Sequence, residues 1–132
     1  MTNDIRKLIA YRLDQAAETL DAARELVAAG HYRDAVNRAY YAMFYCGLAL
    51  LASKGLGASK HSGVLSLFNR YFVRTGEFPL EDGRHLQEAF ELRQRSDYRE
   101  FVQITPEQAQ EAMAQAEAFL EHTRRALVDP KQ

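Results

Sequence analysis

The sequence predicts an all-α fold, an up-and-down bundle of four long helices and one short helix. Apolar residues recur at steps of three and four, the period of an α-helix, in four long stretches and one short stretch. Glycine and proline punctuate the joints between these stretches, and no stretch shows the alternation expected of a strand. The length of 132 residues is that of one domain. We therefore expect residues 1–132 to form a single helical domain.

The first two helices differ in how much of their surface is apolar. The first is expected to start from a cap at Thr2 or Asn3 and to end at Gly30. It carries one apolar stripe: Ile5, Leu8, Ile9, Leu13, Ala16, Leu20, Ala23 and Val27. The second, over residues 32–54, is apolar on nearly every side, so it must be buried on nearly every side. We expect it to be the central helix and also to be shared with a second subunit.

The remaining helices are shorter or begin with clearer signals. A short third helix follows the glycines at 55 and 57, with Ser59 or Ser62 as its expected cap. The fourth is expected over residues 80–96. The fifth begins at Thr105, where a capping residue is followed by proline at the first helical position and glutamine at the third. Residues 129–132 are expected to form a frayed tail.

Composition excludes several broad classes. Charged residues make up 27% of the chain and nearly balance, with a formal net charge of −1. No global field therefore attracts nucleic acid or anionic membrane, and any contact with a polyanion must be local. The single cysteine, Cys46, cannot form an internal disulfide, which fits a reducing cytosol. No apolar run has the length needed to span a bilayer, so we expect a soluble, cytoplasmic protein without membrane association.

The fourth helix carries charge where its pattern calls for apolar residues. Arg93 and Asp97 continue the stripe begun by Leu86, Ala89 and Phe90. A buried guanidinium or carboxylate costs several kcal/mol unless it finds a partner. These two side chains lie one turn apart, so a structural ion pair and a functional site both remain open. Tyr98 should approach Arg93 only if the helix ends or distorts near Ser96, because five helical steps turn it away by about 140°.

A second polar group lies where the third helix begins. Lys60, His61 and Ser62 would place a cation beside free backbone amides, an arrangement that binds anions, and arginine grips phosphate bidentately. The two groups together could hold a phosphodiester. Metal-free RNA cleavage needs a base and a donor for the developing charge, roles that histidine or carboxylate and arginine can fill. The ordinary interpretation is that Lys60 and His61 are solvated loop residues. The spacing of a di-metal carboxylate centre is absent, so no metal or cofactor is expected.

Three segments together resemble the HEPN-domain family. They are the run over residues 37–45 (NRAYYAMFY), the helix entry over residues 60–64 (KHSGV), and Phe90-Glu91-Leu92-Arg93 followed by Asp97-Tyr98. The resemblance implies an α-helical bundle that commonly dimerises through its long helices. It also implies a toxin and antitoxin pair, in which such a protein is encoded beside a small nucleotidyltransferase. Many members are metal-independent ribonucleases whose site lies at the dimer interface.

The chain departs from the family signature of an arginine followed, after four to six residues, by histidine. Arg93 matches the arginine, but Tyr98 stands at the histidine position and His85 lies upstream. Tyrosine is a poor base at neutral pH, and Arg93 would lower the pKa of an adjacent Asp97. We therefore predict binding of RNA or a nucleotide with weak or lost endoribonuclease activity. The assigned residues are Arg93, Asp97 and Tyr98 for catalysis, and Lys60, His61, Ser62 and Arg95 for substrate binding.

The alternative is a non-catalytic helical module that binds a protein partner. In that case Arg93 and Asp97 are a structural ion pair, and the function lies in the surface offered to another protein. Removing one charge would then leave the other buried without a partner, at a cost of roughly 3 to 5 kcal/mol.

Overall fold

The computed structural model describes residues 1–98 and 101–128, and these residues form helices and loops without a strand. The predicted all-α class, with four long helices and one short helix, is confirmed. A π-helical turn, η1, extends the short helix. The elements are α1 (Asn3–Ala28), α2 (Tyr32–Ser53), α3 (His61–Phe68), η1 (Asn69–Val73), α4 (Leu80–Tyr98) and α5 (Pro106–Ala126). None of the helices in this described part is both long and apolar enough to cross a membrane.

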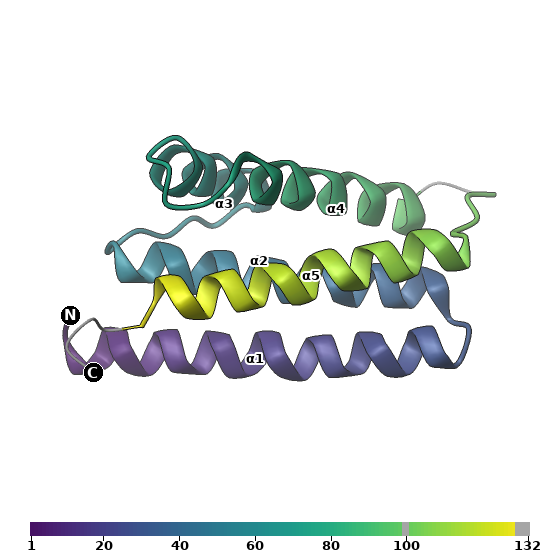
Figure 1. Cartoon of the computed structure of the whole chain (residues 1–132), viewed down its shortest axis with the longest axis horizontal. Helices are drawn as coiled ribbons and strands as arrows, with labels where there is room; N and C mark the ends of the chain where they lie inside the picture. Colours follow the sequence, from purple (N-terminus) through teal and green to yellow (C-terminus); the bar gives the residue numbers. More distant parts are fainter. Residues whose placement is uncertain (99–100, 129–132) are drawn as a thin grey trace.

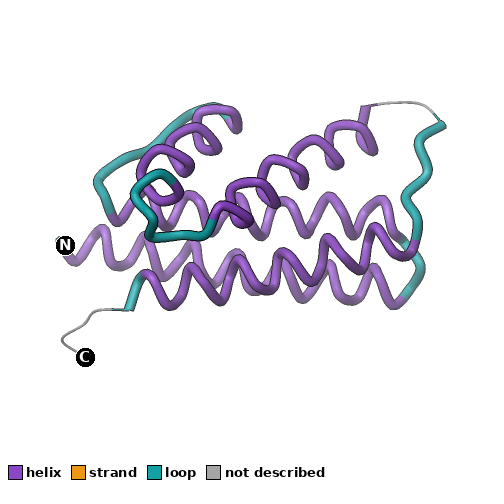
Figure 2. Tube along the Cα trace, turned by 45° about the horizontal axis from the view of Figure 1, so that its top comes forward, coloured by secondary structure: helices purple, strands orange, loops and turns teal. Residues whose placement is uncertain are grey.

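The helices form two layers. α1, α2 and α5 lie side by side along the long axis, and α3 and α4 lie across one face of this layer (Figures 1 and 2). α2 contacts each of the other four α-helices, and twelve of its residues are buried. The predicted central position of this helix is therefore confirmed, and its sharing with a second subunit stays a prediction. Figure 2 shows α4 inclined across the lower layer, where it packs on α2.

Most helix ends follow the expected chemistry. The Thr2 hydroxyl accepts a hydrogen bond from the Ile5 amide at 3.2 Å, which confirms Thr2 as the cap of α1. Gly30, with φ of +80°, follows α1 in the left-handed region that favours glycine. Thr105 and Gln108 exchange two hydrogen bonds of 2.9 and 3.1 Å, so the predicted capping box of α5 is confirmed.

Two predicted ends differ from the structure. The cap of α3 is Lys60, whose side chain makes no capping hydrogen bond, so the prediction of Ser59 or Ser62 was wrong. The backbone is still extended at Lys60, which leaves Ser59 too early to cap and places Ser62 inside the first turn. α4 continues past Ser96 to Tyr98. The Ser96 hydroxyl donates to the Arg93 carbonyl at 3.0 Å, a bond compatible with continued helix. The predicted tail, residues 129–132, lies outside the described residues.

The interior is closed by aromatic packing and by one close backbone approach. Phe68, Phe72, Phe78 and Phe119 are buried, and their ring centroids lie 5.2 to 6.1 Å apart. α4 approaches η1 at Gly83, where an added Cβ would lie 2.4 Å from Asn69 Oδ1 and 3.1 Å from Val73 Cγ2. Each buried phenyl ring contributes about 1.5–3 kcal/mol of transfer free energy. These contacts fix η1 and the start of α4 against the core.

Cys46 belongs to this core. Its side chain is fully buried, and burial raises the pKa of its thiol to about 12. The reactive form of cysteine is the thiolate, so the neutral thiol at physiological pH has a packing role.

A buried carboxylate joins the start of α4 to the end of α5. Asp82, in the first turn of α4, is 3% exposed, and its Oδ2 lies 2.7 Å from Nδ1 of His122. A negative charge at this position also interacts favourably with the N-terminal end of the helix dipole. The pair explains how an aspartate can be accommodated in the interior.

Replacing His122 with alanine is expected to lower the free energy of unfolding by about 2 kcal/mol, because the Asp82 carboxylate loses its hydrogen-bond partner in a buried site. Urea denaturation followed by circular dichroism measures this change. Glu121→Ala is the matched control on α5, since Glu121 and its partner Arg125 are both exposed. The control should change stability by less than about 0.5 kcal/mol. Equal stability of the two variants would show that the Asp82 contact contributes nothing.

Candidate functional site

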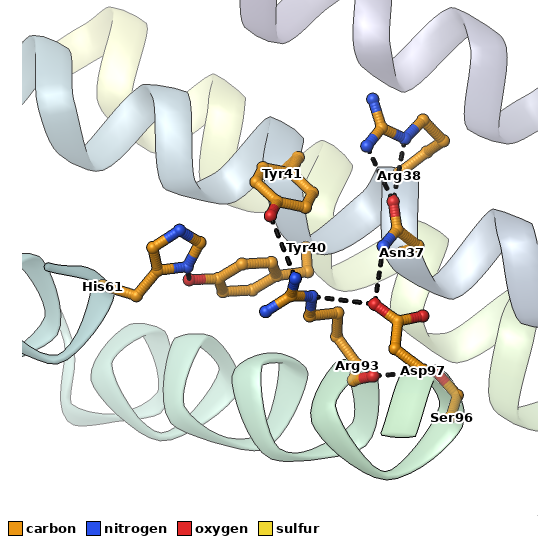
Figure 3. Close-up of polar contacts among 8 residues, drawn as sticks. All are labelled: Asn37, Arg38, Tyr40, Tyr41, His61, Arg93, Ser96 and Asp97. Atoms are coloured by element: carbon orange, nitrogen blue, oxygen red, sulfur yellow. Dashed lines mark hydrogen bonds and ion pairs between the residues drawn. The ribbon is translucent and has the colours of Figure 1, made fainter. Parts of the chain in front are cut away.

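The candidate site lies where α4 packs on α2. These helices run antiparallel, and two hydrogen bonds join them one turn apart (Figure 3). Asn37 Nδ2 donates to Asp97 Oδ2 at 2.9 Å, and an Arg93 terminal nitrogen donates to the Tyr41 hydroxyl at 3.1 Å. Two residues four apart on α2 therefore meet two residues four apart on α4. This register brings Arg93 and Asp97 against the polar residues of α2.

Arg93 is a largely buried cation with unused donors. Its side chain is 13% exposed, which confirms the predicted inward position. Nε lies 3.0 Å from Asp97 Oδ2, but its N–H is not directed at this oxygen and finds no hydrogen-bond partner among the described residues. Of the several N–H groups on the guanidinium, one is bound, by Tyr41. Nε is shielded from solvent beside Asp97, so an anion would bind to the terminal nitrogens of the guanidinium.

Three tyrosine rings surround this guanidinium. Its carbon lies 5.9, 5.3 and 5.6 Å from the ring centroids of Tyr40, Tyr41 and Tyr98. Tyr98 is 73% exposed, and α4 stays helical through this residue. Tyr98 and Arg93 therefore meet at the last residue of α4, two positions after Ser96. The long arginine side chain covers the distance that helical geometry imposes, and the aromatic faces stabilise its charge.

A second arginine completes the polar cluster. Arg38 Nε and a terminal nitrogen donate to Asn37 Oδ1 at 3.0 and 2.7 Å, and its guanidinium carbon lies 5.0 Å from the Tyr41 ring centroid. Tyr41 thus contacts two arginines. Asn37 and Arg38 were not among the residues predicted for the site. The available signal was a polar pair within a helix that is otherwise apolar on nearly every side.

His61 enters the cluster from the first turn of α3. Its Nδ1 lies 2.7 Å from the Tyr40 hydroxyl, and its ring stacks on Phe44 with centroids 4.3 Å apart and planes 20° apart. Burial, with a further contribution from Arg93, lowers the pKa of His61. Burial raises the pKa of Tyr40 above its usual value. At neutral pH the site therefore contains a neutral imidazole bonded to a neutral phenol.

The structure brings some of the predicted residues together and separates others. Arg93, Asp97, Tyr98 and His61 contact the cluster described above. Lys60 and Ser62 are exposed at the start of α3, beside His61 in the chain. Arg95 lines two hollows, one of about 250 Å³ with Gln108 and Glu111 and one of about 630 Å³ with Tyr98. Arg95 therefore lies beside the cluster at Tyr98.

The arrangement combines three chemical capacities. Arg93 offers a cation with free donors, His61 offers a neutral imidazole, and half-buried aromatic rings at Tyr41, Phe44 and Tyr45 offer stacking faces. Stacking on such rings is a common way to hold the bases of single-stranded nucleic acid. In the described residues, no three histidine, cysteine, aspartate or glutamate side chains are grouped to hold a metal ion.

Three proteins related in sequence cover nearly all of the chain. A protein of Thermotoga maritima named "UPF0332 protein" is 43% identical over 129 residues, which are 98% of each chain. Two proteins of Methanocaldococcus jannaschii are named "Putative toxin MJ0605" and "Putative toxin MJ0142". The first is 39% identical over 96% of this chain and 94% of its own length. The second is 36% identical over 95% of this chain and 82% of its own length.

A family model described as the HEPN domain matches residues 9–126. This range contains every residue of the cluster, from Asn37 on α2 to Tyr98 on α4, and it extends to the last residue of α5. The helical bundle, the inward arginine and this match agree with the resemblance found in the sequence. The chain belongs to the HEPN-domain family.

Proposed function

We propose that this protein is the toxin component of a toxin and antitoxin pair and that it binds RNA through the Arg93 cluster. The supporting observation is the guanidinium of Arg93, which is 13% exposed, is held between tyrosine rings and has donors that no described residue uses. A phosphodiester can accept two parallel hydrogen bonds from such a fork, as a carboxylate also can. The relatives named as toxins support the biological role.

RNA is favoured over a free nucleotide by what surrounds the cation. Tyr41, Phe44 and Tyr45 form a half-buried aromatic surface along α2, long enough to contact more than one base. The net charge of −1 provides no long-range attraction, so affinity must come from these local contacts. Tyr98 in place of the signature histidine predicts slow metal-independent cleavage.

The proposal is tested with labelled single-stranded RNA and wild-type protein in buffer containing EDTA. We expect fluorescence anisotropy to report binding that weakens as salt is raised, and an excess of AMP to compete poorly. Gel analysis should show slow cleavage of RNA and none of DNA with the same sequence. Absence of binding to both RNA and AMP would refute the proposal. Equal competition by AMP would identify a nucleotide site.

We also propose two protein partners. The first is a second copy of this chain, placed so that RNA binds at the seam between the two copies, because α2 keeps Tyr41, Phe44, Tyr45 and Leu48 partly exposed along one side although the helix is central. The second is a nucleotidyltransferase antitoxin, in keeping with the relatives named as toxins. Light scattering should give twice the mass of 15.1 kDa. Co-expression with a nucleotidyltransferase encoded next to this chain should yield a complex that survives size-exclusion chromatography.

One observation favours the alternative of a non-catalytic module. Arg93 and Asp97 lie 3.0 Å apart, and each also has a partner on α2, so the pair could serve to hold α4 on α2. Under this alternative the charges stabilise the fold and RNA is not bound. The stability of the single and double variants at these two positions separates the two functions.

A further inference from the structure

The site contains a histidine that the sequence signature does not place there. The signature position is occupied by Tyr98, whose side chain is largely exposed and whose phenol is a poor base. His61 reaches the same cluster from the first turn of α3. It approaches the hydroxyl of Tyr40 while Arg93 lies against the ring of that tyrosine. One buried tyrosine therefore links the histidine to the arginine.

The imidazole is held in a defined orientation. Nδ1 is bound to the Tyr40 hydroxyl at 2.7 Å, and stacking on Phe44 restricts rotation of the ring. Nε2 makes no hydrogen bond to a described residue, and Figure 3 shows this nitrogen on the side of the ring away from Tyr40. The residue is half-buried, so Nε2 is within reach of a ligand at the surface.

The protonation state suits a base. The groups that face His61 are the phenols of Tyr40 and Tyr41 on α2 and the cation of Arg93 on α4, and Lys60 precedes it in the chain. Burial and the arginine charge lower the pKa of His61, so the ring is neutral at pH 7. The phenol of a tyrosine can accept a hydrogen bond as well as donate one. Nδ1 can therefore carry the hydrogen and donate it to Tyr40, which leaves a lone pair on Nε2.

We propose that His61 is the proton acceptor for RNA cleavage at this site, with Tyr40 as the residue that positions it. This proposal depends on the proposed function. Nε2 takes the proton of a ribose 2′-hydroxyl, the 2′-oxygen forms a bond to the adjacent phosphorus, and the bond from phosphorus to the 5′-oxygen breaks. The 5′-oxygen takes a proton from water, and the imidazolium returns its proton to solvent. The products are a 2′,3′-cyclic phosphate and a 5′-hydroxyl, and no metal or redox partner takes part.

The test compares wild-type protein with His61→Asn in EDTA, using labelled single-stranded RNA. Asparagine keeps a polar atom near the position of Nδ1 but does not titrate. We expect cleavage to fall about a hundredfold, while RNA affinity changes by less than about threefold. The wild-type rate should rise with pH through the lowered pKa of His61 and level off above it, and this rise should be absent in the variant. His85→Asn, on α4, is the matched control and should cleave like wild type.

The outcomes separate this proposal from the function on which it depends. Cleavage by wild type and His61→Asn at equal rates, with the same pH profile, overturns the role of His61 and leaves RNA cleavage in place. Binding without cleavage by wild type overturns the role of His61 and leaves RNA binding in place. Tyr40→Phe provides a second check, because loss of the orienting hydroxyl should lower the rate at saturating RNA while leaving the affinity unchanged. An unchanged rate in that variant contradicts the positioning role.

Discussion

Replacing Arg93 with alanine is expected to weaken binding of single-stranded RNA about a hundredfold. The change removes a desolvated guanidinium whose free donors can form a two-point contact with phosphate, and hydrogen bonds to charged groups contribute about 1.5–3 kcal/mol each. Fluorescence anisotropy at fixed salt measures the effect. Arg93→Lys should restore only part of the affinity, because lysine keeps the charge but lacks the planar fork.

Two controls show whether the loss is specific. Arg84 lies on the same helix and is exposed beside Glu88, so Arg84→Ala should change RNA affinity by less than about threefold. Asp97→Ala removes a carboxylate next to the guanidinium, so it should leave RNA binding intact or strengthen it even though it destabilises the fold. An equal loss of affinity in Asp97→Ala and Arg93→Ala would attribute the effect to unfolding.

The second large effect concerns stability. Arg93→Ala and Asp97→Ala are each expected to lower the free energy of unfolding by about 2 kcal/mol, because the first removes the hydrogen bond to Tyr41 and the second removes the hydrogen bond from Asn37. We expect the double variant to be no more stable than either single variant. Arg93 Nε is not directed at Asp97, and both side chains have further partners on α2, so little coupling is available. Chemical denaturation of the three variants measures this coupling.

The opposite result has a clear meaning. A double variant more stable than both single variants would show that the two charges are present mainly for each other. Combined with unchanged RNA binding, that outcome would favour the non-catalytic module over the proposed function. A matched cycle at Arg84 and Glu88, an exposed pair with the same spacing, should give a coupling of about 0.3–0.5 kcal/mol.

The fold could be predicted from the sequence because its signals are local. The capping box at Thr105 and the turn at Gly30 involve residues within a few positions of each other, and the apolar stripes need only helical periodicity. The cap of α3 was mispredicted because Ser59 and Ser62 both have suitable side chains, and the choice depends on where the backbone leaves its extended path. That path is set by packing of the whole chain.

The site was predictable only in part. The inward position of Arg93 follows from the spacing on one helix, but the roles of Asn37 and His61 depend on how α2, α3 and α4 are arranged. Asn37 and Asp97 are 60 positions apart, and Tyr40 and His61 are 21 apart. The periodicity of residues within one helix gives no information on contacts between different helices. The family resemblance rested on three segments, and the structure shows that these segments pack together.

The close approach at Gly83 bears on the position of Arg93, a residue that Gly83 does not contact. An α-helix is stiff, so a tilt at one end displaces the residues further along it. Arg93 lies ten residues beyond Gly83 on α4, a distance of about 15 Å. A Cβ at residue 83 would require Asn69 to rotate away or α4 to tilt from η1. A tilt of α4 at this point would displace Arg93, and its guanidinium would lose its alignment with Tyr41. The lack of a side chain at Gly83 therefore helps to set the position of Arg93.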